Sequence, residues 1–305
     1  MVIPDSKIQS PSRISVFINL IAGKRSSIPI QEKLEEIFNS LGIESSYYFT
    51  EPDKGLREIV ESELNRGVKD FVVVGGDGTV NMVARHLLGN KANLGIIPVG
   101  SGNGLARHLK IPLQLSKLPD YIRWHKILKM DYGMINDLPF FCTAGLGFDA
   151  KVALSFSEQK KRGFSNYLKV ILKDFAAYKS ETLSIDFHGK SISSPFFMTT
   201  FANTEQFGNN AYISPKASAQ DGLLDMCLVS PFPKIKATLM GQLLMSGNIE
   251  SSKYYEMIRI KEAVLIRDRP DWIHIDGDPL LMPERLVVKV IPASLNVWVS
   301  DEYFS

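Results

Sequence analysis

The sequence predicts an α/β fold, in which an N-terminal doubly wound, Rossmann-like domain precedes a C-terminal β-sandwich domain. Short apolar runs alternate with helical patterns in the first part of the chain, as parallel strands joined by helical crossovers require. Past about residue 130 the pattern changes to alternating apolar and polar residues, which is typical of antiparallel strands. The length of 305 residues suits two domains.

The first domain is expected to span residues 1–132, with residues 296–305 able to complete it, and the second to span residues 133–295. In the first domain, continuous apolar runs predict strands that are covered on both faces. Apolar residues at helical spacing predict the intervening helices. The expected strands cover 15–19, 45–50, 71–74 and 94–97, and the expected helices cover 30–41, 56–64 and 80–88.

In the second domain, alternation with a period of two predicts strands that bury one face. Residues 183–187 alternate before a turn at 188–190, and residues 194–204 are expected to return antiparallel. Two further strands are expected at 286–290 and 295–299, and two helices at 167–175 and 237–245. These elements fit a sandwich with helical insertions.

The charge balance and the apolar pattern exclude several classes of protein. Lys and Arg number 35 against 33 Asp and Glu, a net charge of +2, which argues against a dedicated nucleic-acid binder. No apolar run approaches the ~18 residues of a spanning helix, and the N-terminus lacks a secretory pattern. Cys142 and Cys227 each stand in an apolar run, as buried thiols do in a reducing compartment. We therefore expect a cytoplasmic protein.

A glycine-rich loop follows the expected strand at 71–74. Gly75, Gly76 and Gly78 flank Asp77, and Thr79 stands where a helix N-cap belongs. Glycines let backbone N–H groups approach an anion, and a helix N-terminus favours negative charge. The loop therefore predicts a phosphate cradle, in which Asp77 faces either a divalent cation or a hydroxyl group. A simple tight turn is the alternative for an isolated Gly-Asp-Gly.

A second glycine-rich loop lies one strand and one helix later. Gly100, Ser101 and Asn103 follow the strand at 94–97 in the run PVGSGNG. The ends of neighbouring parallel strands can line one crevice, which is where ligands bind in doubly wound sheets. Neither loop has the Walker Gly-Lys-Ser/Thr ending or the Rossmann fingerprint, so neither a P-loop NTPase nor an NAD dehydrogenase is indicated.

Together these motifs resemble the diacylglycerol kinase catalytic-domain family, which includes bacterial diacylglycerol kinases and sphingosine kinases. The chain contains GGDGTVN, PVGSGNGLAR, an Asn-x-x-Ala-Gly from Asn19 and Ile275-Asp276-Gly277-Asp278, in the family's order over essentially its whole length. GGDGT alone is also found in NAD kinases and, more distantly, in phosphofructokinases.

The resemblance implies a lipid kinase that uses ATP and magnesium. It implies that the first domain binds the nucleotide, that Asp77 helps to organise the magnesium, and that the second domain receives the lipid. The residues expected at the nucleotide are Asn19, Thr50, Gly75, Gly76, Gly78, Thr79, Gly100, Ser101 and Asn103.

The family's Asp-Gly-Glu motif supplies a general base, which points to Asp276. Here Asp278 replaces the family's glutamate, and its shorter side chain changes the reach of that contact. Phosphoryl transfer does need a carboxylate to accept the hydroxyl proton. Taken without the resemblance, Asp276 and Gly277 also suit a type I′ turn of a hairpin.

Two further sites follow from the resemblance. The segment from Asp221 matches a family segment that holds a structural magnesium ion, with the Asp221 carboxylate and the Leu223 carbonyl as ligands; a plain turn is the alternative. Asp149 lies in a segment similar to the family's lipid-facing region and is a candidate for contacting the substrate's polar group. A helix N-cap before Ala150 is the alternative for Asp149.

The partner expected from these features is a lipid substrate presented at a membrane surface. A basic cluster at Lys160, Lys161 and Arg162, before a helix with Lys169 and Lys173, suits peripheral contact with anionic lipid; a solvated helix face is the alternative. A homodimer is compatible with the sequence. The scattered histidines receive no catalytic role, and an NAD kinase or a catalytically silent lipid-binding protein of the same fold are the alternative functions.

Overall fold

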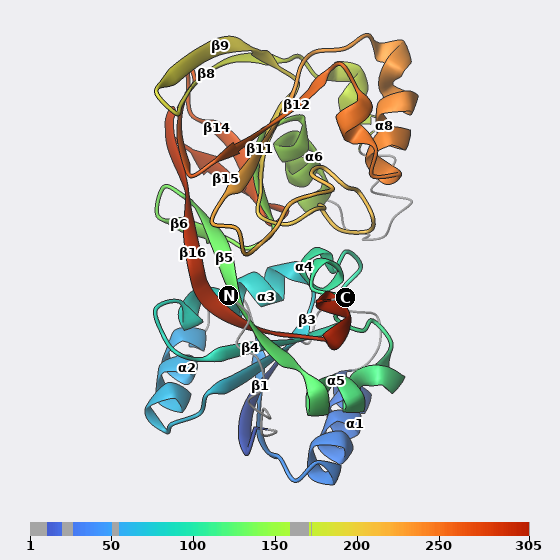
Figure 1. The fold of residues 1–305 in the computed structure, drawn as a ribbon, viewed down its shortest axis with the longest axis vertical. Helices are drawn as coiled ribbons and strands as arrows, with labels where there is room; N and C mark the ends of the chain where they lie inside the picture. Colours follow the sequence, from blue (N-terminus) through green and yellow to red (C-terminus); the bar gives the residue numbers. More distant parts are fainter. Residues whose placement is uncertain (1–10, 20–26, 51–54, 159–170, 172, 305) are drawn as a thin grey trace. The chain divides into compact units, whose positions relative to one another are not determined.

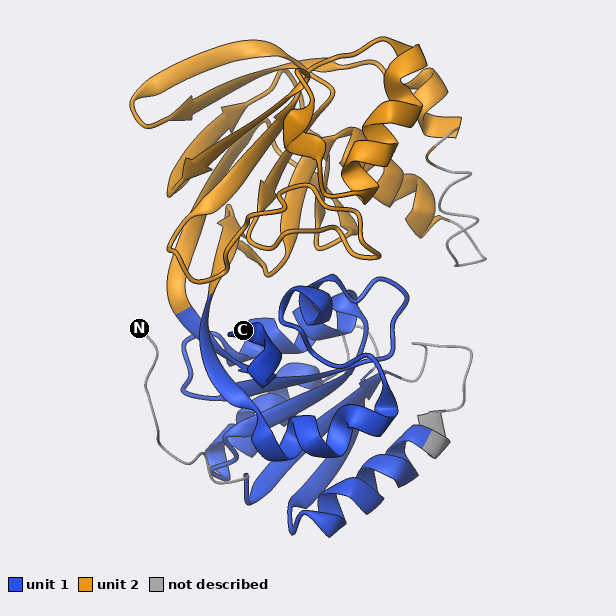
Figure 2. Cartoon of the chain, turned by 45° about the vertical axis from the view of Figure 1, so that its right-hand side comes forward, with its two compact units in different colours: residues 1–130, 294–305 blue, residues 131–293 orange. Residues whose placement is uncertain are grey.

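The computed structural model describes residues 11–19, 27–50, 55–158, 171 and 173–304. The chain divides into two compact units, which Figure 2 shows in different colours. Unit 1 comprises Met1–Met130 and Ser294–Ser305, and unit 2 comprises Asp131–Ala293. No helix in the described part of the chain is long and apolar enough to cross a membrane.

Unit 1 is built on a parallel sheet with the strand order β2-β1-β3-β4, and the end of β16 pairs in parallel with β4. Helices lie on both faces of this sheet (Figure 1). The strands are β1 (Arg13–Asn19), β2 (Glu44–Thr50), β3 (Asp70–Gly75), β4 (Asn93–Pro98) and β16 (Arg285–Val299), and the helices are α1 (Ser27–Ser40), α2 (Leu56–Asn65), α3 (Asp77–Leu87), α4 (Gly104–His108) and α5 (Leu118–Trp124).

The central strands of unit 1 are apolar along their length because both faces of the sheet are covered. Residues 71–74 of β3 and 94–97 of β4 are fully buried. Trp298, at the end of β16, stacks on His125 with 3.9 Å between ring centroids, and it occupies the space above Gly95, where a Cβ atom would lie 2.7 Å from its ring. The predicted doubly wound domain is confirmed.

Unit 2 is a sandwich of two sheets, as predicted. One sheet has the order β12-β11-β10-β7-β14-β15, and its strands pair antiparallel. The other contains β9, β8, β13 and the beginning of β16, together with β5 and β6. The strands are β5 (Lys126–Ile135), β6 (Leu138–Phe140), β7 (Thr143–Gly147), β8 (Glu181–Phe187), β9 (Lys190–Phe196), β10 (Met198–Ala202), β11 (Leu224–Val229), β12 (Tyr255–Ile260), β13 (Glu262–Ile266), β14 (Asp271–Ile275) and β15 (Asp278–Met282).

Alternation along β11 shows how unit 2 buries both faces of its first sheet. Leu224, Met226 and Leu228 point into the core between the sheets, whereas Cys227 and Val229 point into a second apolar cluster on the opposite face. Helices α6 (Phe148–Ser157) and α8 (Ala237–Met245) contribute to that second cluster.

The described residues of the two units also form short 3₁₀ helices. These are η1 (Leu115–Lys117) and η4 (Asp301–Tyr303) in unit 1, and η2 (Lys234–Lys236) and η3 (Ile249–Ser251) in unit 2.

Two sequence predictions need correction, and a third concerns a segment that the structure describes only in part. Residues 194–204 do not form one strand: the chain leaves β9 after Phe196 and enters the other sheet as β10. The strands expected at 286–290 and 295–299 are one strand, β16, in which the left-handed Ala293 (φ 50°) shifts the alternation. Of the helix expected at 167–175, the structure describes 171 and 173–175, which are helical.

Candidate functional site

Several predicted nucleotide-site residues lie at the carboxyl edge of the unit 1 sheet. Asn19 pairs with Thr50 in the register of β1 and β2, and Gly75 pairs with Pro98 in the register of β3 and β4. The Asn19 Nδ2 donates a hydrogen bond of 2.8 Å to the Thr79 hydroxyl, and the Thr50 hydroxyl donates to the Ile18 carbonyl. Adjacent strands thus bring together residues that are distant in sequence.

The two glycine-rich loops touch each other. A Cβ atom on Gly100 would lie 2.6 Å from the Gly76 Cα, so glycine is required for this approach of the two backbones. Gly75 is packed as closely, because a Cβ there would lie 2.5 Å from the Thr79 Cβ. The contact between the loops is therefore compatible with the prediction that both strand ends line one crevice.

The Asp77 side chain extends from the first glycine loop to the helix that follows the second loop. Asp77 is the first residue of α3, and its Oδ1 accepts a hydrogen bond of 3.1 Å from the Leu105 N–H in α4. Burial raises the pKa of Asp77, although backbone N–H groups of Gly104, Leu105, Asp77 itself and Asn103 act in the lowering direction. The carboxylate is thus oriented by the backbone and only partly solvated.

The helix after the first glycine loop begins earlier than expected. Gly76 is the N-cap of α3, so Thr79 lies in the first turn and is not the N-cap. The buried Thr79 hydroxyl instead receives the bond from Asn19. Gly78 lies in the same first turn, where N–H groups have no earlier carbonyl to bond.

In the second glycine loop, Asn103 adopts a left-handed conformation (φ 51°) and closes the turn by donating from Nδ2 to the Gly100 carbonyl at 2.8 Å. Ser101, at the tip of the loop, is exposed. The loop therefore presents the Ser101 hydroxyl to solvent beside a turn that the Asn103 side chain closes.

The Asp276 carboxylate is held by the backbone of another strand connection. Its Oδ2 accepts a bond of 2.9 Å from the Phe141 N–H, and its Oδ1 accepts bonds of 2.7 and 3.0 Å from Cys142 and Thr143. Asp276 (φ 49°) and Gly277 (φ 90°) form the left-handed turn between β14 and β15. These three backbone donors fix the orientation of the carboxylate.

Asp149 is also enclosed within unit 2. It lies in the first turn of α6, whose N-cap is Gly147, so the N-cap alternative is wrong. Its Oδ1 accepts from the Ala150 N–H at 2.8 Å, and its Oδ2 accepts from the Thr200 hydroxyl at 2.6 Å. The carboxylate lies over Gly145, where a Cβ would overlap the Asp149 Oδ2.

His274 is the site residue that the sequence reasoning missed. Its Nε2 lies 3.2 Å from the Asp149 Oδ2, and its Nδ1 accepts a long, 3.4 Å bond from the Gly277 N–H. The ring thus has one nitrogen facing the Asp149 carboxylate and the other facing the β14–β15 turn. Thr200 and His274 are both register partners of Gly145, which explains how three strands gather one polar group.

Alternation in Trp272-Ile273-His274-Ile275 places His274 on the face opposite the core residue Ile273. The sequence thus contained a signal for its orientation. The register that brings it to Gly145 depends on β7, which is remote in sequence.

The predicted magnesium ligands Asp221 and Leu223 lie in the turn before β11. The Asp221 Oδ1 accepts from the Leu223 N–H at 3.1 Å, and Asp221 is exposed. Asp131 accepts from the Gly222 N–H at 2.7 Å. Burial raises the pKa of Asp131 and of Asp225, and the charge of Asp221 raises both further.

These oxygen ligands and their mutual repulsion suit a hard divalent cation. The side chains of the described residues nevertheless contain no group of three or more candidate metal ligands placed together.

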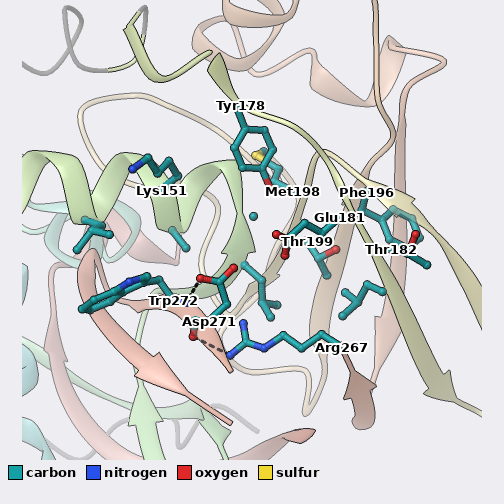
Figure 3. A pocket seen from close by; sticks show the side chains of 15 residues that line it. Lys151, Tyr178, Glu181, Thr182, Phe196, Met198, Thr199, Arg267, Asp271 and Trp272 are labelled. Atoms are coloured by element: carbon teal, nitrogen blue, oxygen red, sulfur yellow. Dashed lines mark hydrogen bonds between the residues drawn. The ribbon is translucent and has the colours of Figure 1, made fainter. Parts of the chain in front are cut away.

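A cavity of about 260 Å³ opens beside α6 in unit 2, and Figure 3 shows its lining. Its apolar wall comes from Leu146, Leu154, Leu183, Phe196 and Met198. An apolar wall of this kind suits a hydrocarbon group.

The polar side of the cavity includes Lys151, Glu181, Arg267 and Asp271. The Arg267 guanidinium, beside Asp271 in Figure 3, donates to the carbonyls of Asp271 and Met282 at 2.7 Å each. Burial lowers the pKa of Arg267, and the charge of Asp271 opposes this. The cavity therefore combines hydrocarbon and polar surface.

Each predicted residue can thus be placed in one of the two units. Unit 1 contains Asp77 and all the predicted nucleotide residues, whereas unit 2 contains Asp149, Asp221, Leu223 and Asp276. The basic residues Lys160, Lys161, Arg162 and Lys169 lie outside the described residues, and Lys173 is exposed.

Comparisons with known proteins agree with this division. The model of the diacylglycerol kinase catalytic domain matches residues 13–135, and that of the YegS C-terminal NAD kinase beta sandwich-like domain matches residues 142–299. In a solved structure of a diacylglycerol kinase from Bacillus anthracis the fold is shared, with a TM-score of 0.75 at 16% identity over 97% of this chain and 99% of that one.

Curated relatives extend the comparison at the level of sequence. A Pseudomonas aeruginosa (strain UCBPP-PA14) protein named "Probable lipid kinase YegS-like" is 30% identical over 277 residues, covering 84% of this chain and 85% of the relative. A protein of Mycobacterium tuberculosis named "Diacylglycerol kinase" is 26% identical over 251 residues, covering 79% and 80%. With both family models matched in order, the chain belongs to the diacylglycerol kinase family of lipid kinases, in its YegS-like form.

Proposed function

We propose that this protein transfers the γ-phosphoryl group of ATP, with the help of magnesium, to a hydroxyl group of diacylglycerol or a related lipid. The observation that carries the proposal is the contact between Gly76 and Gly100, which joins two glycine loops around Asp77 at the carboxyl edge of a parallel sheet. Phosphates bind at such edges, where glycine lets backbone N–H groups approach them. Membership in a lipid kinase family supports the choice of acceptor.

Unit 1 would hold the nucleotide. In this proposal the N–H groups at the start of α3 bind phosphate oxygens, and the Asn19–Thr79 hydrogen bond fixes the loop that carries them. The remaining positions, proposed to border the nucleotide, are Thr50, Gly75, Gly78, Gly100, Ser101 and Asn103.

In this proposal magnesium binds at two places, each of which provides at least one carboxylate. Asp77 would contact the catalytic ion, and its preset orientation and raised pKa are consistent with a carboxylate that gains from a nearby cation. Asp221, with the Leu223 carbonyl, would hold a structural ion. Bound magnesium neutralises charge on the phosphates during transfer.

Asp276 would accept the proton of the lipid hydroxyl. As that oxygen bonds to the γ-phosphorus, the bond from phosphorus to the bridging oxygen breaks, ADP leaves and the proton passes to the carboxylate. The N–H groups of Phe141, Cys142 and Thr143 fix the Asp276 carboxylate in place. Because these bonds engage both of its oxygens, Asp278 at the start of β15 is the competing acceptor that the variants below distinguish.

The lipid would bind in unit 2, with its polar group near Asp149 and its hydrocarbon in the neighbouring cavity. The cavity is lined by Gly147, Ala150 and Lys151, which flank Asp149 in the chain. Its volume of about 260 Å³ accommodates part of a lipid, so the ends of long acyl chains would remain outside.

The proposal is tested by incubating the purified protein with radiolabelled ATP and a panel of diacylglycerol, phosphatidylglycerol, ceramide and sphingosine, with and without magnesium. We expect a labelled lipid that depends on magnesium. A labelled NAD in a parallel reaction, with no labelled lipid, would establish the NAD kinase alternative. Lipid binding without any transfer of label would establish a silent lipid-binding protein.

A further inference from the structure

One surface of unit 2 exposes apolar side chains between lysines. From Ser230 to Asn248 the chain contains Lys234 and Lys236 and no acidic residue. Ile235, between the two lysines, is 88% exposed, and Leu239 on the next turn is 46% exposed. A solvated helix usually presents polar residues at such positions.

The exposure is confined to one side of α8. Met240 is buried in the apolar cluster on the sheet, and Leu243 and Leu244 pack against that cluster, whereas Met245 is 44% exposed. Ile235, Leu239 and Met245 therefore lie on the side of the segment that faces away from the protein. Figure 1 shows α8 at the margin of its unit.

Two partly buried aromatic rings, Phe232 and Tyr254, pack against the same apolar cluster as Met240, and Lys253 lies over one of them. The Phe232 and Tyr254 rings lie 5.9 Å apart between centroids, and the Lys253 Nζ lies 5.3 Å from the Tyr254 ring. Lys234 is tied to the protein, because its Nζ donates to the Ala176 carbonyl. The combination of exposed aliphatic groups and lysines is typical of proteins that lie in a membrane interface.

Among the residues that the structure describes, no ion pair involves Lys234, Lys236 or Lys253. Glu250 is paired with Lys216, which lies outside the surface. Glu256, on β12, is exposed. We use the name α8 surface for the exposed residues Lys234, Ile235, Lys236, Leu239, Met245 and Lys253.

We propose that the α8 surface docks the protein on an anionic lipid bilayer. Ile235, Leu239 and Met245 enter the interface between head groups and acyl chains, and Lys236 and Lys253 bind anionic head groups. The inference rests on the proposed function, because a kinase of long-chain lipids must reach a substrate that stays in the bilayer. A second copy of the chain fits less well, since a two-fold contact would bring the same lysines together.

Binding to vesicles, measured by sedimentation without ATP, tests the proposal. The wild type should bind vesicles of phosphatidylcholine with phosphatidylglycerol more tightly than vesicles of phosphatidylcholine alone. The Ile235→Ser/Leu239→Ser double variant should lose about tenfold in partitioning, because it removes the two most exposed aliphatic groups of the surface. Leu113→Ser is the matched control, since Leu113 is 41% exposed in unit 1.

The charge contribution is tested by Lys236→Glu/Lys253→Glu against the control Lys190→Glu at the start of β9. The former should abolish the preference for phosphatidylglycerol, and the control should keep it. Equal vesicle binding by wild type and Ile235→Ser/Leu239→Ser would overturn the proposal. So would a protein whose sedimentation-equilibrium mass is that of a dimer and falls to the monomer in that double variant.

The outcome is separable from that of the proposed function. Vesicle binding that depends on the α8 surface, with no lipid phosphorylated by any preparation, would contradict the kinase proposal alone. Phosphorylation of a short-chain soluble lipid with unchanged vesicle binding by the variants would contradict the docking proposal alone. All variants are compared by thermal unfolding, so that loss of fold is not mistaken for loss of binding.

Discussion

The imidazole Nε2 of His274 lies 3.2 Å from the Asp149 Oδ2, and the same ring accepts a bond from the Gly277 N–H. This chain of contacts connects the first turn of α6 with the turn that carries Asp276 and Asp278. Both His274 and Asp149 are buried at their side chains. The position of the proposed proton acceptor therefore depends on an interaction between a helix and a strand end.

Replacing His274 tests whether this contact positions the turn. His274→Ala removes one partner of a buried hydrogen bond and should destabilise the protein by about 1–3 kcal/mol. We expect kcat for the lipid to fall while the KM for ATP stays unchanged, because the nucleotide residues lie in unit 1. His274→Gln, which can restore a donor toward Asp149, should recover part of kcat. If kcat falls and the KM for ATP rises to the same extent, and His274→Gln does not restore kcat, the role of His274 is purely structural.

Gly145 is required for the same cluster. In Gly145→Ala the added Cβ would overlap the Asp149 Oδ2 and lie 2.8 Å from the His274 Nε2. We expect a loss of about 1–3 kcal/mol in the free energy of unfolding, as for other overpacked sites. Gly241→Ala in α8, where a Cβ meets nothing within 4 Å, is the control and should stabilise by about 0.5–1 kcal/mol. Urea denaturation of both variants provides the comparison.

Gly100→Ala tests the contact between the glycine loops. Its Cβ would lie 2.6 Å from the backbone of Gly76, which cannot move aside as a flexible side chain could. The loops should separate, and the affinity for ATP measured by calorimetry should fall tenfold or more, as a loss of about 1.4 kcal/mol gives. An unchanged affinity would mean that the joined loops do not hold the nucleotide.

Asp77 provides a prediction for pH. Burial raises its pKa above the ordinary value of 3.8, so the folded state binds the proton more tightly than the unfolded state. The stabilisation that protonation provides is present below the unfolded-state pKa and is lost as the pH rises through the folded-state pKa. Asp77→Asn cannot ionise, so its melting temperature should exceed that of the wild type at pH 7, with the gap closing in acid.

The same Asp77→Asn variant should turn over more slowly and need a higher magnesium concentration for half-maximal activity in the kinase assay. A variant that is less stable than the wild type at neutral pH would contradict the argument from burial. An unaltered response to magnesium would remove Asp77 from the proposed ion site.

Asp276→Asn tests which of the two carboxylates at the β14–β15 connection accepts the proton. It removes the proton acceptor and should lower kcat by about a hundredfold or more, with ATP binding nearly intact. Asp278→Asn is the companion variant and should retain most of the turnover. The reverse ranking would assign the proton to Asp278 and leave Asp276 as an anchor for the N–H groups of Phe141, Cys142 and Thr143.

Local chemistry made much of unit 1 predictable from sequence. The glycines at 75, 76 and 100 indicated a close backbone approach, and the Gly76–Gly100 contact requires one. The start of α3 was less predictable, because Thr79 is a good N-cap residue in isolation, whereas its hydroxyl here bonds Asn19 from another strand. Tertiary contacts decided between two locally acceptable arrangements.

Unit 2 shows what a single sequence lacks. Alternation identified most strands, but the strand of residues 194–204 is divided at Phe197 between two sheets, which periodicity alone does not reveal. The Asp149, Thr200 and His274 cluster depends on the register of β10, β7 and β14. Those pairings join segments more than 50 residues apart for β10 and β7 and more than 120 for β7 and β14.

The route of β16 determines when the protein can finish folding during its synthesis. Residues 296 and 297 pair with β4, and Trp298 fills the space above Gly95, so the sheet of unit 1 is completed only by residues that are synthesised after unit 2. Until then the unit 1 residues before Asp131 have an open sheet edge and an unfilled core. An isolated fragment of residues 1–130 should therefore aggregate, and a chain that ends before Trp298 should also aggregate.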